Sequence, residues 1–205
     1  MRQPIIIGVT GGIGAGKSTV VEAFARRGAV AFSADTAVHE LYALPQVIDA
    51  VRERWGDHVF TRAGEVDRRA IAGIVFTDDA ERVWLESLLH PLVGDAWQHF
   101  VDEQAGLPEP PEFVVAEVPL LYEAGLEDRY DVVVAIPAPH DLRMERIAAR
   151  ADGRSLPAER SAAQMRQRDK AARADIAFTN AGSLDELDAF AELTLADLRT
   201  RAASQ

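Results

Sequence analysis

The sequence predicts an α/β fold in which helices cover both faces of a parallel β-sheet. Five short apolar runs, several of them rich in β-branched residues, are typical of strands that are buried on both faces. Helical patterns separate these runs, as right-handed β-α-β units require. We therefore expect a three-layer α/β/α domain around a five-stranded parallel sheet. Its strands are predicted at Ile5–Val9, Ala29–Phe32, Phe113–Val118, Val132–Ile136 and Asp175–Thr179.

A glycine-rich motif lies between the first predicted strand and the helix that follows it. Residues 11–18 read Gly-Gly-Ile-Gly-Ala-Gly-Lys-Ser, which fits the phosphate-binding pattern G-x-x-x-x-G-K-[ST] in its strand–loop–helix context. The alternative, a glycine-rich turn without a ligand, does not explain this context. The backbone of such a loop binds phosphate oxygens, its lysine reaches the β- and γ-phosphates, and its serine is a ligand for Mg²⁺. We therefore predict a P-loop NTPase fold that binds ATP with Mg²⁺. The predicted ATP-binding residues of the loop are Gly12, Ile13, Gly14, Ala15, Gly16, Lys17, Ser18 and Thr19, with Ser18 as the metal ligand.

The charge of the chain is unevenly distributed. The 205 residues carry a net charge of −11, which disfavours general binding to nucleic acid or to an anionic membrane. Residues 140–173 nevertheless contain nine basic and five acidic side chains, so this segment carries +4 and the remainder −15. A basic segment on an acidic chain favours a clamp for phosphate groups. Lys17 and Lys170 are the only lysines among the 22 basic residues.

The chain contains no cysteine, which excludes disulfides, thiolate catalysis and cysteine-based zinc sites and fits a reducing compartment. The apolar stretches are shorter than a membrane span, and the one at the N-terminus is needed as the first strand. We expect a soluble, cytoplasmic protein with no nucleic-acid or membrane partner. The sequence leaves the oligomeric state open, with a monomer as the expected form.

The spacing of the predicted strands divides one kinase domain, residues 1–205, into three parts. Residues 33–112 separate the second strand from the third, far more than one crossover helix needs. We predict a core of 1–34, 112–139 and 174–205, a helical substrate-binding insertion at 35–111, and a small basic lid at 140–173 that closes over ATP. Within the insertion, Pro91 should kink a long helical pattern or start a new helix. A capping box that begins at Ser183 predicts the start of the last helix.

Two acidic residues are candidates for chemistry because ligands of open parallel sheets bind at the carboxyl ends of the strands. Asp35 follows the second strand, where a carboxylate could accept a proton from an acceptor hydroxyl or hold Mg²⁺ through water. The alternative is that Asp35 only caps the next helix. Glu117 ends the third strand and is a candidate metal ligand through water. Its alternative is an ordinary acid at a strand end.

Arginines recur on one face of a predicted helix in the basic segment. Arg143, Arg146 and Arg150, with Arg154 beyond them, are spaced by three and four residues. Arginines presented together bind triphosphate oxygens and neutralise charge that develops during transfer. The alternative is a solvated helix face on which they pair with nearby acids. The candidate catalytic side chains are therefore Asp35, Lys17, Arg143, Arg146 and Arg150.

Several short motifs follow one another in a characteristic order. Besides the P-loop they are Ala34-Asp35, Gly64 to Arg68, Leu89-His90-Pro91, Pro119-Leu120-Leu121-Tyr122-Glu123, Arg146 with Arg150, Gln164, and Ala174-Asp175 through Asn180 to Ser183. This set resembles the dephospho-coenzyme A kinase family over nearly the whole chain. The resemblance implies transfer of the γ-phosphoryl group of ATP to the ribose 3′-hydroxyl of dephospho-CoA. It implies further that Asp35 acts as base, that the arginines lie in or beside the lid, and that Asn180 belongs to the ATP site. In this family the insertion would bind dephospho-CoA through Asp35, Arg68 and His90.

Three positions depart from the usual pattern of that family. His39 stands where the family commonly has an arginine, and Tyr122 where it usually has phenylalanine. Residues 176–179 are less aliphatic than its usual last strand. Taken without the resemblance, His90 is interpreted as a hydrogen-bonded structural histidine rather than a catalyst.

Three alternative functions compete with this prediction. Another small-molecule P-loop kinase, of the adenylate or shikimate type, would differ in its acceptor. A guanine-nucleotide switch needs the strings N-K-x-D and D-x-x-G, and neither occurs in the chain. A nucleotide-binding scaffold without activity is disfavoured because Lys17, Ser18 and Asp35 are all present.

Overall fold

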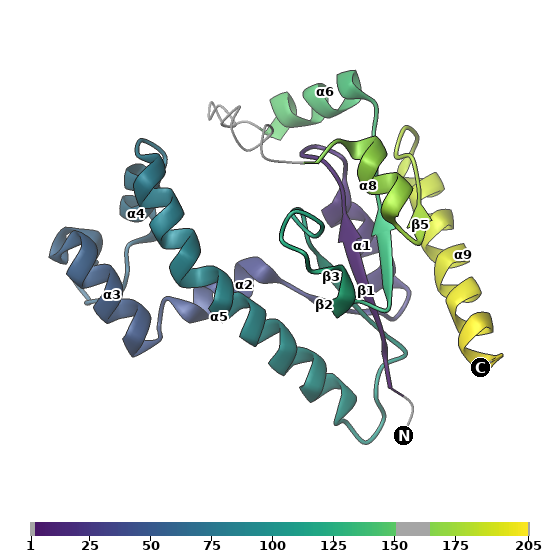
Figure 1. Cartoon of the computed structure of the whole chain (residues 1–205), viewed down its shortest axis with the longest axis horizontal. Helices are drawn as coiled ribbons and strands as arrows, with labels where there is room; N and C mark the ends of the chain where they lie inside the picture. The colour runs from purple at the N-terminus through teal and green to yellow at the C-terminus, as the bar shows by residue number, and fades with distance from the viewer. Residues whose placement is uncertain (1–2, 151–164, 205) are drawn as a thin grey trace. The chain divides into compact units, whose positions relative to one another are not determined.

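The computed structural model describes residues 3–150 and 165–204 and contains a five-stranded, all-parallel sheet (Figure 1). The order of the strands in the sheet is β2-β3-β1-β4-β5. All five predicted strands are present, although the last is short. At its start the carboxylate of Asp175, rather than a backbone carbonyl, accepts the N–H of Val133 at 2.8 Å. The strands are β1 (Ile5–Thr10), β2 (Val30–Phe32), β3 (Phe113–Glu117), β4 (Val132–Ala135) and β5 (Ile176–Ala177).

The helices account for most of the remaining described residues. They are α1 (Lys17–Arg26), α2 (Ala34–Leu41), α3 (Pro45–Trp55), α4 (Arg68–Val75), α5 (Asp79–Ala105), α6 (His140–Arg150), α8 (Gln167–Arg173) and α9 (Leu184–Ala203). The predicted start of the last helix is confirmed, because the hydroxyl of Ser183 accepts the N–H of Glu186 at 3.3 Å. Within residues 3–150 and 165–204, no helix combines the length and the apolar character needed to span a membrane.

The chain forms two compact units. The first comprises Met1–Phe32 and Gln104–Gln205 and contains the whole sheet with α1, α6, α8 and α9. The second, Ser33–Glu103, contains α2, α3, α4 and most of α5. Each unit has a hydrophobic cluster of its own.

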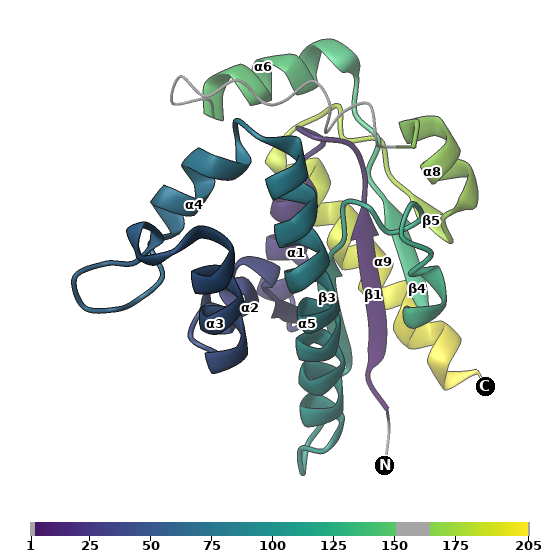
Figure 2. The same ribbon diagram turned by 60° about the vertical axis from the view of Figure 1, so that its left-hand side comes forward.

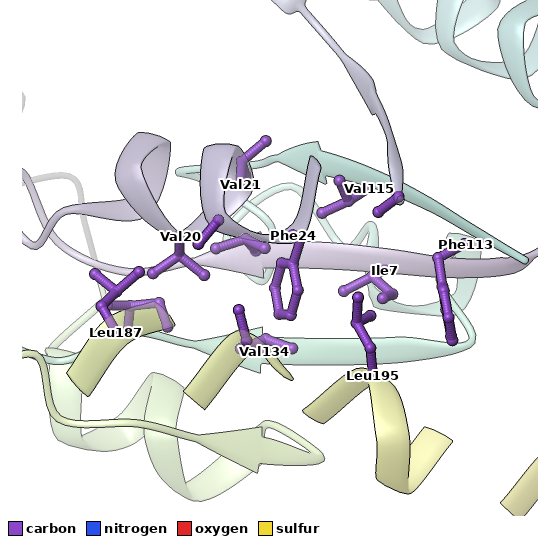
Figure 3. Close-up of a cluster of buried hydrophobic side chains, with 14 of the residues drawn as sticks. Ile7, Val20, Val21, Phe24, Phe113, Val115, Val134, Leu187 and Leu195 are labelled. Atoms are coloured by element: carbon purple, nitrogen blue, oxygen red, sulfur yellow. The ribbon is translucent and has the colours of Figure 1, made fainter. Parts of the chain in front are cut away.

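One face of the sheet is covered by α1 and α9 (Figure 3). Ile7 of β1 and Val134 of β4 point from the sheet toward Phe24 of α1 and Leu195 of α9, and all four are buried. The rings of Phe24 and Phe190 lie 6.3 Å apart and join the two helices. Burying one side chain of this size contributes about 1.5–3 kcal/mol to folding. This packing therefore fixes α1, and with it the loop that precedes α1.

The opposite face of β1 is so close to its cover that only glycine fits there. A Cβ on Gly8 would lie 2.8 Å from the ring of Tyr130 and 2.9 Å from the side chain of Leu121. Val133 of β4 belongs to the same cluster, and Met165, just before α8, packs against it. Since α8 also contacts β4 and β5, the predicted three-layer arrangement is confirmed within this unit.

The second unit packs its helices around two tryptophans. The rings of Trp55 and Trp84 meet edge to face at 4.9 Å, and the indole N–H of Trp55 donates to the carboxylate of Glu81 at 2.8 Å. The polar tip of the buried indole is thereby satisfied.

Pro91 does not start a new helix, because α5 continues through it as one element. Proline removes one backbone donor from the helix. The neighbouring Leu89 and Leu92 are nevertheless packed in the core of the second unit. Burial of these side chains on both sides of Pro91 favours the continuous helix, which the local sequence does not reveal.

Leu195→Ala is expected to lower the free energy of unfolding by about 2–5 kcal/mol, because it leaves a cavity in the core. Leu195 is 1% exposed, whereas Leu193 on the same helix is 70% exposed. Leu193→Ala is therefore the matched control and should change the free energy of unfolding by at most about 0.5 kcal/mol. Chemical denaturation measures both, and equal losses would contradict the buried face assigned to α9.

Candidate active site

The glycine loop lies where α/β proteins bind their ligands. The connection that leaves β1 leads to β2 on one side of the sheet, and the connection that leaves β3 leads to β4 on the other. A crevice between the carboxyl ends of β1 and β3 is the expected ligand site of such a sheet. Val9 lies opposite Glu117 in the pairing of these strands, so the acid and the loop share one edge. Figures 1 and 2 show α6 at the same end of the sheet.

The loop has the tight backbone that the motif predicts. Gly14 and Gly16 have φ angles of 74° and 90°, in the left-handed region that favours glycine. A Cβ on Gly14 would lie 2.8 Å from the carbonyl oxygen of Arg143. A Cβ on Gly16 would overlap the side-chain amide of Asn180. Both glycines are thus required by backbone conformation and by close neighbours.

Glu117 contacts both functional side chains at the end of the P-loop. Lys17, Ser18 and Thr19 form the first turn of α1. The Ser18 hydroxyl donates to Oε2 of Glu117 at 2.7 Å, and Nζ of Lys17 lies 3.4 Å from Oε1. The Lys17 ammonium also donates to the carbonyl of Gly12 at 3.2 Å. Burial lowers the pKa of Lys17; Glu117 opposes that shift, and the charges of nearby basic groups add to it.

Helix α6 brings two of the three predicted arginines to the glycine loop. Nε of Arg143 donates to the carbonyl of Ile13 at 2.7 Å, and Nη1 of Arg146 donates to that of Ala15 at 3.4 Å. Within the described residues neither arginine is paired with Asp141 or Glu145, and both donate to the glycine loop instead; Asp152, the third acid of the ion-pair alternative, lies outside the described residues. The third, Arg150, is the last residue of α6. Arg154 and Gln164 lie outside the described residues, as does 151–164 of the predicted lid.

Asn180 holds the glycine loop in place through hydrogen bonds. It is 4% exposed, and its Nδ2 donates to the carbonyl of Ala15 at 2.8 Å. Its Oδ1 accepts from Arg146 at 3.3 Å, and its backbone N–H donates to the carbonyl of Pro137 at 2.8 Å. Asn180 thus links the P-loop to α6 and to the end of β4, a role that the resemblance alone does not specify.

The helix-cap alternative for Asp35 is wrong. Ser33 caps α2, because its hydroxyl accepts the N–H of Thr36 at 3.1 Å. Asp35 is the second residue of the helix and is exposed. Among the described residues, none forms a hydrogen bond or ion pair with its side chain. Its carboxylate is therefore not the cap of α2.

Asp35, Arg68 and His90 all belong to the second unit. Nη1 of Arg68 lies 3.2 Å from Nδ1 of His39. The histidine that replaces the usual family arginine is thus a direct neighbour of a predicted substrate residue. His90 is exposed on α5, and the described parts of the chain offer its ring no hydrogen bond, so its interpretation as a hydrogen-bonded structural histidine is wrong.

Sequence reasoning missed two residues that support the site from α8. The side-chain amide of Gln167 forms two hydrogen bonds with the backbone of Ala138, at 3.0 and 3.1 Å, and lies against Gly12. Lys170 is fully buried and donates to the hydroxyl of Thr10, which directly precedes the glycine loop, at 3.4 Å. Composition held a signal for the second of these, since Lys170 is the one lysine outside the P-loop.

Comparison with known proteins identifies the family. The dephospho-CoA kinase family matches residues 5–186 of the chain. The chain belongs to this family. The dephospho-CoA kinase of Frankia casuarinae is 37% identical and aligns over 95% of this chain and 84% of its own length. That of Thermobifida fusca is 36% identical over 89% of this chain and 90% of its own length. The family predicted from the ordered motifs is therefore confirmed.

Solved structures agree with the fold. A protein from Thermus thermophilus is 32% identical, with a TM-score of 0.67 over 96% of this chain and 99% of that one. Dephospho-CoA kinase from Campylobacter jejuni has a TM-score of 0.68 at 24% identity, over 94% of this chain and 96% of that one. Shikimate kinase from Aquifex aeolicus has a TM-score of 0.53 at 15% identity, over 98% of this chain and 100% of that one. The last two likenesses confirm the P-loop kinase fold alone.

Gly16→Ala is expected to weaken ATP binding by about tenfold or more, equivalent to about 1.4 kcal/mol. The left-handed backbone strains alanine, and its Cβ displaces Asn180 from the carbonyl of Ala15. Gly28→Ala is the matched control, because Gly28 has a φ of 94° but no heavy atom within 4 Å of a built Cβ. It should lower stability and keep ATP affinity. Titration calorimetry measures both, and equal affinities would contradict the support assigned to Asn180.

Proposed function

We propose that this chain transfers the γ-phosphoryl group of ATP to the ribose 3′-hydroxyl of dephospho-CoA, the last step of coenzyme A synthesis. The observation that carries the proposal is the contact of Glu117 with both Lys17 and Ser18. This is the arrangement expected around a metal–triphosphate in a P-loop enzyme. The family, whose match extends through both compact units, supplies the acceptor.

Three cationic side chains lie at the glycine loop and are proposed to bind the triphosphate. Lys17, Arg143 and Arg146 each donate to a backbone carbonyl of residues 12–15. They therefore already reach the loop whose N–H groups bind phosphate, and the same donors can turn to phosphate oxygens. Fixed positive groups of this kind stabilise the charge that spreads over the transferred group in the transition state.

The oxygens of Ser18 and Glu117 fit the ligand preference of Mg²⁺. This ion takes hard oxygen ligands and is usually shared by one or two protein groups, several waters and the substrate phosphates. We infer that Ser18 binds it directly and that Glu117 holds it through water. The bound ion would neutralise charge on the β- and γ-phosphates.

Asp35 is the proposed general base. Because Ser33 caps α2, the carboxylate of Asp35 is not used as the helix cap. The chain reaches Asp35 three residues after β2, and ligands bind beyond the carboxyl ends of such strands. In the proposed step this carboxylate takes the proton of the acceptor hydroxyl. The hydroxyl oxygen attacks the γ-phosphorus of ATP at the same time, and ADP leaves. Arg68 and His90 are proposed to bind dephospho-CoA.

The cysteine-free composition supports the further proposal that the enzyme works in the reducing cytoplasm. We also propose that it acts as a monomer. Another small-molecule P-loop kinase shares the fold, as the likeness to shikimate kinase shows, but the family match favours dephospho-CoA.

With ATP and Mg²⁺ the protein is expected to phosphorylate dephospho-CoA and to leave AMP, shikimate and pantothenate unchanged. The four acceptors differ in the accepting group, which is a phosphate in AMP and a hydroxyl in the others, or in the groups around it, so a site built for one of them rejects the others. A coupled assay of ADP release, with product mass as confirmation, makes the comparison. Turnover of another acceptor alone would contradict dephospho-CoA as the substrate and would support only the assignment as a kinase.

Asp35→Asn is expected to lower kcat by about 10²- to 10⁴-fold, because it removes the base and keeps the shape of the side chain. Its melting temperature should stay unchanged. Ser33→Ala is the matched control on the same helix end: it should cost about 1 kcal/mol of stability through loss of the cap and keep turnover. A folded Asp35→Asn enzyme with the wild-type kcat would show that Asp35 is not the base, and Glu117 would be the next candidate.

A further inference from the structure

Lys170 of α8 is fully buried, an uncommon environment for an ammonium group. Its Nζ donates to the carbonyl of Pro119 at 2.5 Å and to the hydroxyl of Thr10 at 3.4 Å. It also lies 2.9 and 3.1 Å from the two carboxylate oxygens of Glu123. An ammonium has three N–H donors, and three groups surround it here. The side chain is therefore fully satisfied and held in one position.

Two of these acceptors belong to the strand ends that carry the nucleotide site. Thr10 is the last residue of β1, and the glycine loop begins at the next residue. Pro119 follows Glu117 by two residues, and the Thr10 hydroxyl donates to the Pro119 carbonyl at 3.4 Å. The ammonium of Lys170 thus holds the chain that leaves β3 against the chain that leaves β1. The contact of Glu117 with Ser18 depends on the separation of these two segments.

Glu123 balances the buried charge and ties a further segment to it. Its carboxylate accepts the backbone N–H of Met165 at 2.7 Å. Burial by itself raises the pKa of Glu123, but the hydrogen bonds from Lys170 and Met165 outweigh that effect and hold the pKa below its usual value. The carboxylate is therefore ionised at neutral pH, as a buried partner of an ammonium must be.

We propose that Lys170 is a positioning residue for phosphoryl transfer, which fixes the carboxylate of Glu117 opposite Ser18 and Lys17 through its bonds to Pro119 and Thr10. The inference rests on the proposed kinase activity. A compact ammonium suits three converging acceptors, whereas the planar guanidinium of arginine does not. This geometry accounts for a lysine here in a chain that uses arginine at every other basic position outside the P-loop.

The test compares Lys170→Met, the double variant Lys170→Met with Glu123→Gln, and Lys170→Arg. The double variant removes both buried charges, so it separates loss of stability from loss of geometry. We expect kcat to fall by about 10- to 100-fold in all three, the range seen when a supporting group of a metal site is lost. KM for ATP should stay near its wild-type value, because the loop backbone and Lys17 are unchanged. The Mg²⁺ concentration for half-maximal rate should rise, which a stabilising role alone would not cause.

The matched control is Arg173→Met with Glu127→Gln. Arg173 lies on the same helix, pairs with Glu127 and stacks on the ring of Tyr122 at 4.3 Å, and no contact within the described residues joins it to Thr10 or Pro119. This control should keep the wild-type kcat and Mg²⁺ dependence.

A folded double variant of Lys170 and Glu123 with wild-type kcat and Mg²⁺ dependence would overturn the inference. If the lysine variants fail to fold, Thr10→Val decides, because it removes one acceptor without creating a buried charge. A lower kcat with a higher Mg²⁺ requirement supports the inference, and wild-type values for both overturn it. An inactive wild-type protein would instead contradict the proposed function.

Discussion

The parallel pairing of β1 with β3 is the interaction on which the rest of the site depends. In its register Val9 lies opposite Glu117, which places the acid at the first residues of the P-loop helix. A shift of one residue would turn Glu117 to the other face of the sheet, because side chains alternate along a strand. It would also move Phe113 and Val115 of β3 out of the core. Burial of the hydrophobic face of β3 therefore sets the register of β1 with β3, and this register places Glu117 beside Ser18 and Lys17.

The charges around the loop form a second level of organisation. The two lysines of the chain each lie beside one glutamate, Lys17 with Glu117 and Lys170 with Glu123. Buried charges of this kind persist in a fold only when they are paired and hydrogen-bonded. Arg143 and Arg146 stand outside this balance: within residues 3–150 and 165–204 they donate to backbone or amide oxygens and not to acids. Their charge remains available for the phosphates that the loop is built to bind.

The two compact units separate the parts of the proposed reaction. The unit that contains the sheet holds the P-loop, the arginines of α6 and the supporting residues of α8. The unit of helices, with its own core around Trp55 and Trp84, holds Asp35, Arg68 and His90. Nucleotide binding and acceptor binding are thus assigned to elements that fold around different cores, in a single chain whose family match extends through both.

The sequence by itself determined the strands, the P-loop and the family, because each is written in residues that are close together in the chain. A β-branched run, a glycine loop and a capping serine act over a few positions, so their pattern predicts their structure. Tertiary structure decided what lies between distant segments. It carried α5 through Pro91 and brought the side chain of Asn180 to the carbonyl of Ala15. It also gave Lys170 its three acceptors, which come from two distant parts of the chain, Thr10 and the segment 119–123. No local pattern encodes such contacts, because packing and the need to satisfy buried polar groups select them only when the whole chain has folded.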